Sequence, residues 1–227
     1  MADGRRVFVT GGTGYIGSRL IPILLRRGYQ VTALVREQSR GKLPEGCVAV
    51  QGNALDAESY RDAVRGMHTF VQLVGVPHPS PAKAQQFRDI DLRSGLEAVR
   101  AARENNVGHF VYLSAAHPAP VTQAYTGARA ECEQAIRDSG MNATILRPWY
   151  VLGPGHRWPY ALIPFYRVAE LIPSMREGAQ RLGLVTIREM VNALAAAVED
   201  GAESVRVVEV PEIRRLGKRA LSSGPRS

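Results

Sequence analysis

The sequence predicts an α/β fold in which a doubly wound parallel sheet carries helices on both faces. Short, largely apolar runs rich in β-branched residues alternate with longer segments of helical periodicity along most of the 227 residues. Apolar strands that are separated by helices are typical of parallel sheets buried on both sides. With 45% hydrophobic and 22% charged residues, the composition is that of an ordinary globular protein.

In the first half of the chain, short apolar runs rich in β-branched residues predict strands at residues 7–10, 31–35, 48–50 and 70–74. A helix is expected at 15–27, because Ile16, Leu20 and Leu24 recur with helical spacing. Asp56 can cap a further helix that runs to about residue 65, since its carboxylate accepts the first free N–H groups.

In the second half, strands are expected at residues 110–113, 143–146 and 205–210. A long helix at 85–105 places Leu92, Leu96 and Val99 at positions i, i+4 and i+7. A second helix is expected at 124–139, and Thr186 caps a third that runs to about residue 199.

The chain has no repeat or linker that would divide it, so residues 1–212 are expected to form a single domain. The regular alternation loosens after the strand at 143–146, and a minimal cap over the substrate site is expected mainly at 152–185. Residues 213–227 are basic and end in small polar residues, which predicts a disordered tail.

The strongest motif is a glycine-rich loop between the first strand and the first helix. Gly11 permits the tight turn, Gly14 lets the backbone approach a pyrophosphate, and Gly17 lets the helix pack closely on the strand. Free N–H groups at the start of the helix then face the phosphates. The sequence therefore predicts a Rossmann-like dinucleotide site formed by Gly11, Thr13, Gly14, Tyr15, Ile16 and Gly17.

The end of the second strand distinguishes the two nicotinamide cofactors. A site for NAD would have Asp or Glu here to bind the ribose hydroxyls. This chain has Arg36, with Glu37 after it and Arg40 close by. A guanidinium suits a 2′-phosphate through paired, charge-assisted hydrogen bonds, so NADP(H) is favoured over NAD(H).

With the Thr-Gly-Gly-x-Gly-x-x-Gly pattern in place, the chain resembles the short-chain dehydrogenase/reductase superfamily, most closely its atypical or extended branch of epimerase- and reductase-like proteins. The resemblance covers residues 5–212 and also rests on the segments 52–56, 111–114 and 147–154. It implies that Asn53 and Ala54 lie near the adenine and that Val74 and Gly75 flank the cofactor. It also implies that Trp149, Tyr150 and Val151 approach the nicotinamide.

The resemblance further implies a catalytic Tyr-x-x-x-Lys pair with a preceding serine. Here the pair is Tyr125 and Arg129, which share a helical face, and Ser114 is the candidate serine. A cation beside the phenol stabilises tyrosinate, although arginine stays protonated and cannot join a proton relay. A shift of one residue would place Ala115 at the serine position, and Asp91 stands where many relatives carry Asn.

A segment rich in glycine and proline follows the strand at 143–146, beyond its carboxyl end. Open α/β sheets bind ligands at this end of their strands. His156, Arg157 and Trp158 in this segment are candidate substrate contacts, with packing and surface charge as the alternative. The histidines and cysteines lack the spacing of metal ligands, so no metal site is expected.

Two functions remain open. The first is an NADP-dependent oxidoreductase acting on a small carbonyl, enone or quinone-like substrate, with epimerisation as a variant. The second is a non-catalytic NAD(P)(H)-binding sensor or accessory subunit, which the missing lysine favours. A third, weaker alternative is that the basic tail docks on an acidic partner or a membrane surface.

The charge and hydropathy of the chain limit its partners. The net charge is +8, but the arginines are scattered, so no nucleic acid partner is expected. No stretch is long and apolar enough to predict a membrane span or a secretory signal, and a cytoplasmic protein is expected. The sequence leaves the substrate and the oligomeric state open.

Overall fold

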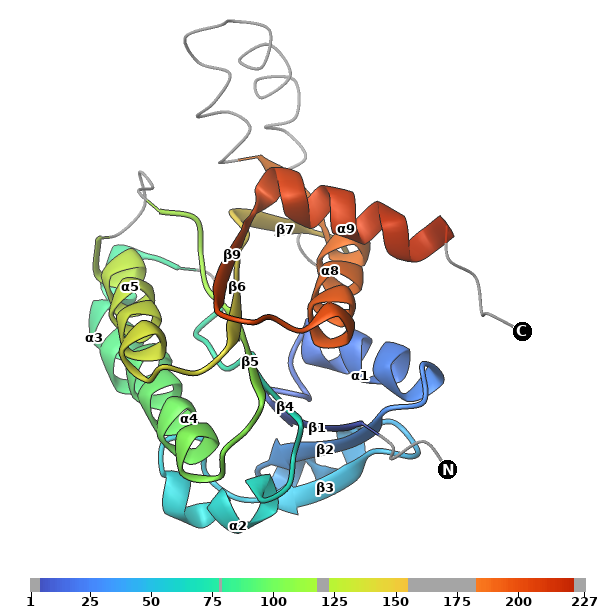
Figure 1. Ribbon diagram of the computed structural model, residues 1–227. Coiled ribbons are helices and arrows are strands. Elements are labelled where there is room, and N and C mark those ends of the chain that lie inside the picture. The colour runs from blue at the N-terminus through green and yellow to red at the C-terminus, as the bar shows by residue number, and fades with distance from the viewer. Residues whose placement is uncertain (1–4, 78, 118–122, 155–182, 223–227) are drawn as a thin grey trace, which may run out of the picture.

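The computed structural model describes residues 5–77, 79–117, 123–154 and 183–222, with side chains as far as Lys218. Its centre is a seven-stranded sheet with the order β3-β2-β1-β4-β5-β6-β9 (Figure 1). All neighbouring strands are parallel. The strands are β1 (Arg6–Thr10), β2 (Gln30–Val35), β3 (Val48–Gln51), β4 (Thr69–Gln72), β5 (His109–Leu113), β6 (Ala143–Arg147) and β9 (Val205–Glu209). The predicted doubly wound parallel fold is confirmed.

Helices cover both faces of this sheet. The α-helices are α1 (Gly17–Arg26), α2 (Arg61–Val64), α3 (Ala84–Gln86), α4 (Arg93–Glu104), α5 (Gln123–Asp138), α8 (Ile187–Asp200) and α9 (Val210–Ser222). Figure 1 shows α1 and α8 on one side of the sheet and α4 and α5 on the other. In β1, Val7 and Val9 join the core under α1 and α8, whereas Phe8 joins the core under α4 and α5.

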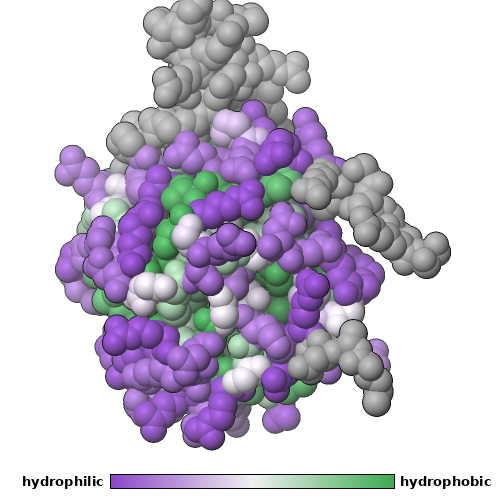
Figure 2. Space-filling model, viewed as in Figure 1, coloured by the Kyte–Doolittle hydropathy of each residue, from purple (hydrophilic) through white to green (hydrophobic). Residues whose placement is uncertain are grey.

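The surface follows from this layering. Figure 2 shows hydrophilic residues over most of the periphery of one face, with hydrophobic groups gathered toward its middle. None of the helices in the described ranges is long and apolar enough to cross a membrane.

The two predicted helix caps are present. The Asp56 carboxylate accepts from the N–H of Glu58 at 3.2 Å, but it caps a short 3₁₀ turn, Ala57–Ser59, ahead of α2. Thr186 begins α8 with a reciprocal capping box, in which its side chain accepts from the N–H of Glu189 and Glu189 accepts from the N–H of Thr186.

The long helix predicted at 85–105 is not uniform. A six-residue π-helical stretch, Phe87–Leu92, separates α3 from α4. This wider turn buries Asp91, and the Cys132 Sγ lies 3.8 Å and 3.6 Å from the carbonyl oxygens of Asp91 and Leu92. A π-helical turn leaves carbonyl groups displaced from the regular helical pattern, so a buried thiol can serve as a weak donor to them.

The prediction of a disordered tail that starts at 213 is wrong as far as residue 222, because α9 occupies this segment. Ile213 and Leu216 are buried in the core cluster that α1 and α8 share, and α9 packs on α8. Helices α9 and α8 approach so closely that a side chain at Gly217 would stand 2.6 Å from the Cα of Glu189. The i, i+3 spacing of Val210, Ile213 and Leu216 was the sequence signal for this helix.

A second, two-stranded sheet lies beside the main one and was not predicted. In it β7 (Tyr150–Leu152) pairs in parallel with β8 (Leu184–Thr186). The pairing brings together the two ends of the segment expected to form the cap, most of which lies outside the described residues.

Candidate cofactor and active site

The glycine loop after β1 has the shape that a phosphate site requires. Gly11 has a φ of +71°, and a side chain there would stand 2.8 Å from the Leu73 carbonyl carbon. A side chain at Gly17 would overlap the Gly11 carbonyl oxygen. α1 begins at Gly17 with no capping side chain and no acidic residue in its first turn. Its N-terminal N–H groups therefore suit an anion.

The loop opens onto a cavity of about 570 Å³ at the point where the strand order reverses, between β1 and β4. Ligands of doubly wound folds bind outside the carboxyl ends of the strands at this position. The cavity brings together many of the predicted site residues, namely Gly11, Gly14, Tyr15, Ile16, Gly17, Gly75, Tyr125, Arg129, Trp149, Tyr150 and Val151.

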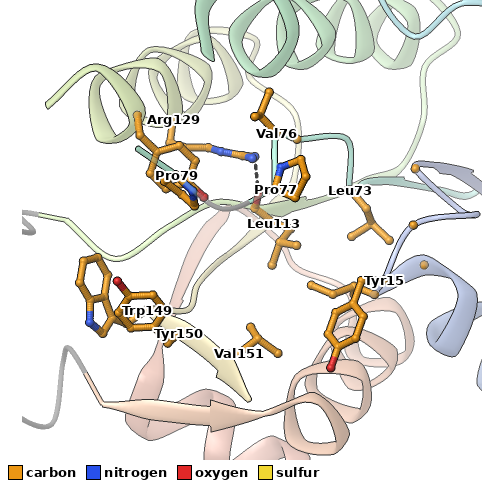
Figure 3. Close-up of a pocket in the computed structure, with 16 residues that line it drawn as sticks. Tyr15, Leu73, Val76, Pro77, Pro79, Leu113, Arg129, Trp149, Tyr150 and Val151 are labelled. Atoms are coloured by element: carbon orange, nitrogen blue, oxygen red, sulfur yellow. Dashed lines mark hydrogen bonds between the residues drawn. The ribbon is translucent and has the colours of Figure 1, made fainter. Parts of the chain in front are cut away.

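Most of the cavity wall is apolar or aromatic. Trp149 and Tyr150 meet edge to face with ring centroids 4.8 Å apart, and they lie across the cavity from the loop that carries Val76, Pro77 and Pro79 (Figure 3). The other lining residues were not predicted from the sequence, namely Leu73, Val76, Pro77, Pro79 and Leu113. Their signal was position, because each belongs to or follows the carboxyl end of β4 or β5.

Arg129 lines the cavity, and two hydrogen bonds hold its guanidinium. Its Nη2 donates to the Asp91 Oδ1 at 2.6 Å. Its Nη1 donates to the Leu113 carbonyl oxygen at 2.8 Å, the bond drawn in Figure 3. Its Cζ lies 5.4 Å from the centroid of the Tyr125 ring. Burial disfavours the charged form, but the surrounding tyrosines and Asp91 outweigh that effect and hold the pKa of Arg129 well above its usual range.

The Arg129 side chain is only 6% exposed, and its Nε–H has no acceptor among the described residues. A buried donor without an acceptor costs stability. The open glycine loop and the uncapped start of α1 fit a dinucleotide cofactor.

Asp91 is fully buried beneath the cavity wall. Its Oδ2 accepts from the N–H of Val76 at 3.0 Å, so one carboxylate joins the loop after β4 to α5. Burial raises the pKa of Asp91, and the Arg129 guanidinium and the Val76 N–H oppose that rise. In the sequence Asp91 marks only a departure from related proteins, and neither of these contacts was predicted.

Ser114 does not face this cavity. Its Oγ donates to the Glu133 Oε1 at 2.6 Å, and Glu133 also accepts from the Arg147 Nε at 2.9 Å. Ser114 and Glu133 are both buried. The structure therefore places the predicted serine in an ion-pair network between β5, β6 and α5.

Thr13, Arg36, Asn53, Ala54 and Val74 are absent from the described lining of the cavity. Arg36 is exposed directly after β2, and Asn53 follows β3, where its Oδ1 accepts from the N–H of Leu55 at 3.1 Å. Both residues follow the carboxyl ends of strands, at the edge of the sheet that carries the glycine loop. Their contacts with the adenosine part of the cofactor stay predictions. His156, Arg157 and Trp158 lie outside the described residues. The described ranges contain no group of three His, Cys, Asp or Glu residues that could hold a metal.

Comparison with known proteins supports a nicotinamide cofactor. The family model described as NAD(P)H-binding matches residues 11–158. A 3-diazoavenalumate denitrifying reductase of a Streptomyces species is 30% identical, over 87% of this chain and 73% of that protein. A 4-hydroxy-2-methyl-3-oxo-4-farnesyl-3,4-dihydroquinoline-1-oxide ketoreductase of Stigmatella aurantiaca is 26% identical, over 65% of this chain and 51% of that protein.

Among solved structures, the Bordetella bronchiseptica enzyme WbmH in complex with NAD⁺ superposes with a TM-score of 0.68 and 23% identity, over 97% of this chain and 83% of that one. This likeness supports the fold. The chain belongs to the NAD(P)H-binding family and is an oxidoreductase-like member of the short-chain dehydrogenase/reductase superfamily.

Proposed function

We propose that the protein is an NADP-dependent oxidoreductase that interconverts a small carbonyl, enone or quinone-like substrate and its reduced form. The observation that carries the proposal is that Tyr125 and Arg129 line the same cavity as the glycine loop. A proton donor and a fixed cation thus share one site with the phosphate-binding loop. Epimerisation through a transient oxidation is a variant of the same chemistry.

In carbonyl reduction, Tyr125 donates its hydroxyl proton to the substrate oxygen as negative charge develops there. A bound nicotinamide dinucleotide supplies the hydride that the carbonyl carbon takes up. Arg129, which stays protonated, stabilises the resulting phenolate, and solvent then returns a proton to it.

The lining favours a compact, flat and apolar substrate. Trp149 and Tyr150 on one side and Val76, Pro77 and Pro79 on the other present mostly carbon surface. Such a slot suits a ring or conjugated system better than a highly charged molecule.

The cofactor preference rests on Arg36. Its side chain is exposed directly beyond β2, and no hydrogen bond or ion pair to another described residue holds it. A 2′-phosphate on the adenosine ribose would give this guanidinium a doubly charged acceptor.

A second candidate function, a non-catalytic NAD(P)(H) sensor or accessory subunit, is favoured by Ser114. Because its hydroxyl is committed to Glu133, the substrate oxygen would lack the serine donor that the family pattern implies. The two functions share a cofactor and differ in turnover.

Calorimetric titration with NADPH, NADP⁺, NADH and NAD⁺, followed by NADPH oxidation assays with a panel of aldehydes, enones and phenanthrenequinone, tests both functions. For an enzyme, Tyr125→Phe should lower turnover by about 100-fold or more while cofactor affinity stays unchanged. Tight binding without turnover across the panel would favour the sensor. Absence of binding to all four dinucleotides would contradict both.

A further inference from the structure

The guanidinium of Arg129 is held by acceptors from separate parts of the fold. Asp91 lies in the π-helical stretch, and the Leu113 carbonyl ends β5. The Tyr112 hydroxyl, also on β5, lies 3.4 Å from Nη1. These contacts fix the plane of the guanidinium and use both of its terminal nitrogens, while Nε–H has no acceptor among the described residues.

Gly75 makes room for this arrangement. A side chain at residue 75 would overlap the Arg129 Nη2 and would stand 3.2 Å from the Asp91 Oδ1. The backbone of Gly75 does not have a positive φ, so glycine is not required for its conformation. The space taken by the guanidinium is therefore the reason for a glycine at this position.

Asp91 also fixes the cavity wall. Its second oxygen accepts from the N–H of Val76, next to Gly75. The Ser94 Oγ donates to the Asp91 carbonyl oxygen at 3.3 Å and accepts from the Gln72 Nε2 at 3.1 Å. Gln72 in turn hydrogen-bonds Thr10, the last residue before the glycine loop. A buried polar chain thus connects Arg129 to the strand that carries the loop.

We propose that Asp91 is the positioning residue for Arg129 and that Gly75 provides the space for its guanidinium. Together the three residues act as one unit that holds the Arg129 guanidinium in the cavity wall, against the bound dinucleotide. The proposal rests on the proposed function in one respect, that a nicotinamide dinucleotide occupies the cavity. π-Helical turns such as the one that carries Asp91 are frequent at functional sites.

The test is a double-mutant cycle on NADPH affinity, with Asp91→Asn, Arg129→Lys and the double variant. Lysine lacks the planar fork that reaches both Asp91 and Leu113. Each single variant should weaken binding about tenfold, and the double variant should bind no more weakly than either single one. Effects that multiply to about a hundredfold would overturn the proposal. Asp89→Asn, an exposed carboxylate in the same π-helical stretch, should bind like the wild type.

Because Asp91→Asn leaves a buried charge without its partner and can prevent folding, a second cycle uses Gly75→Ala. This variant should weaken NADPH binding about tenfold, and adding Arg129→Lys should weaken it no further, so that the double variant binds like Arg129→Lys alone. Gly127→Ala on α5 is the matched control, since a side chain there meets nothing within 4 Å. If Gly75→Ala behaves like Gly127→Ala, or if the two substitutions together weaken binding about a hundredfold, the proposal is wrong.

Titrations are run well below the melting temperature of each variant, so that a variant that is only less stable still binds like the wild type. If the wild type binds no dinucleotide, the proposed function fails and with it the part of the proposal that concerns the dinucleotide. The melting temperatures of the same variants then decide on the unit itself. Additive shifts would overturn it, and non-additive shifts would retain it as a structural unit.

Discussion

Ser114 donates its hydroxyl hydrogen to Glu133 across 2.6 Å, and Glu133 binds Arg147 through a second hydrogen bond of 2.9 Å from Nε. The serine therefore serves as a hydrogen-bond donor to a buried carboxylate on α5. Successive side chains of a strand point to opposite faces of the sheet. Because Leu113 at the end of β5 borders the cavity, the next side chain, Ser114, points away from the cavity and toward Glu133.

Substituting Ser114 by Ala should lower stability and leave the chemistry nearly intact. Glu133 would lose one donor in a buried place, which should cost about 1–3 kcal/mol of unfolding free energy. Urea unfolding measures this cost, and NADPH turnover with the best carbonyl substrate should stay within about threefold of the wild type, since Tyr125 provides the proton. A loss of turnover near 100-fold in a stably folded Ser114→Ala protein would return the serine to the catalytic group.

Substituting Arg36 by Ala should reduce the preference for the phosphorylated cofactor. The loss of a charge-assisted hydrogen bond to a 2′-phosphate should weaken NADPH binding about tenfold or more, while NADH binding stays unchanged. Calorimetry with both reduced dinucleotides gives the ratio of the two affinities. Arg65→Ala is a suitable control, because this side chain is 79% exposed and precedes β4 on the far side from the carboxyl ends. An unchanged ratio in Arg36→Ala would contradict the assignment.

The sheet could be predicted because each strand and helix records its own burial in local spacing. Val7, Phe8 and Val9 are apolar in succession since the strand is covered on both faces. The glycine loop was equally readable, because the needs of its turn and its close packing fall on residues that are neighbours in sequence.

The contacts that define the site were not readable in this way. Arg129 and Asp91 are 38 residues apart, and a helical pattern does not reveal a π-helical turn that buries a carboxylate. The direction of Ser114 depends on Glu133 from a different element. The error over α9 had another origin, since its abundant basic residues outweighed the apolar face formed by Ile213 and Leu216.

His109 should make the fold less stable in acid. It is buried at the start of β5, its Nε2 lies 2.9 Å from the Thr144 Oγ1, and burial lowers the pKa of His109 to about 4. The folded protein therefore holds the neutral ring, whereas the unfolded chain takes up a proton near pH ~6.5. The contribution of neutral His109 to the free energy of unfolding is therefore fully present above about pH 6.5, and it is lost as the pH falls toward about 4.

The loss should amount to about 3 kcal/mol over that interval, and His109→Gln should remove it. Urea unfolding of both proteins at several pH values measures the difference, and subtraction cancels the groups that the two proteins share. Parallel pH profiles for the wild type and His109→Gln would show that His109 takes up its proton equally in both states.

The last helix should be essential to the domain. Ile213 and Leu216 are buried in the core, and their helix packs on α8. Arg214 donates to the Leu184 carbonyl oxygen at the start of β8 through Nε at 3.0 Å and Nη2 at 2.8 Å. Truncation after Glu212 removes all of these contacts and should abolish cooperative unfolding.

Ile213→Ala should lower the free energy of unfolding by about 2–5 kcal/mol, because burial is lost and a cavity remains. Arg215→Ala, whose side chain is 68% exposed, should change stability by less than about 1 kcal/mol. Calorimetric melting of the three proteins separates a folded helix from a dispensable tail, because a dispensable tail would leave all three midpoints equal to that of the wild type.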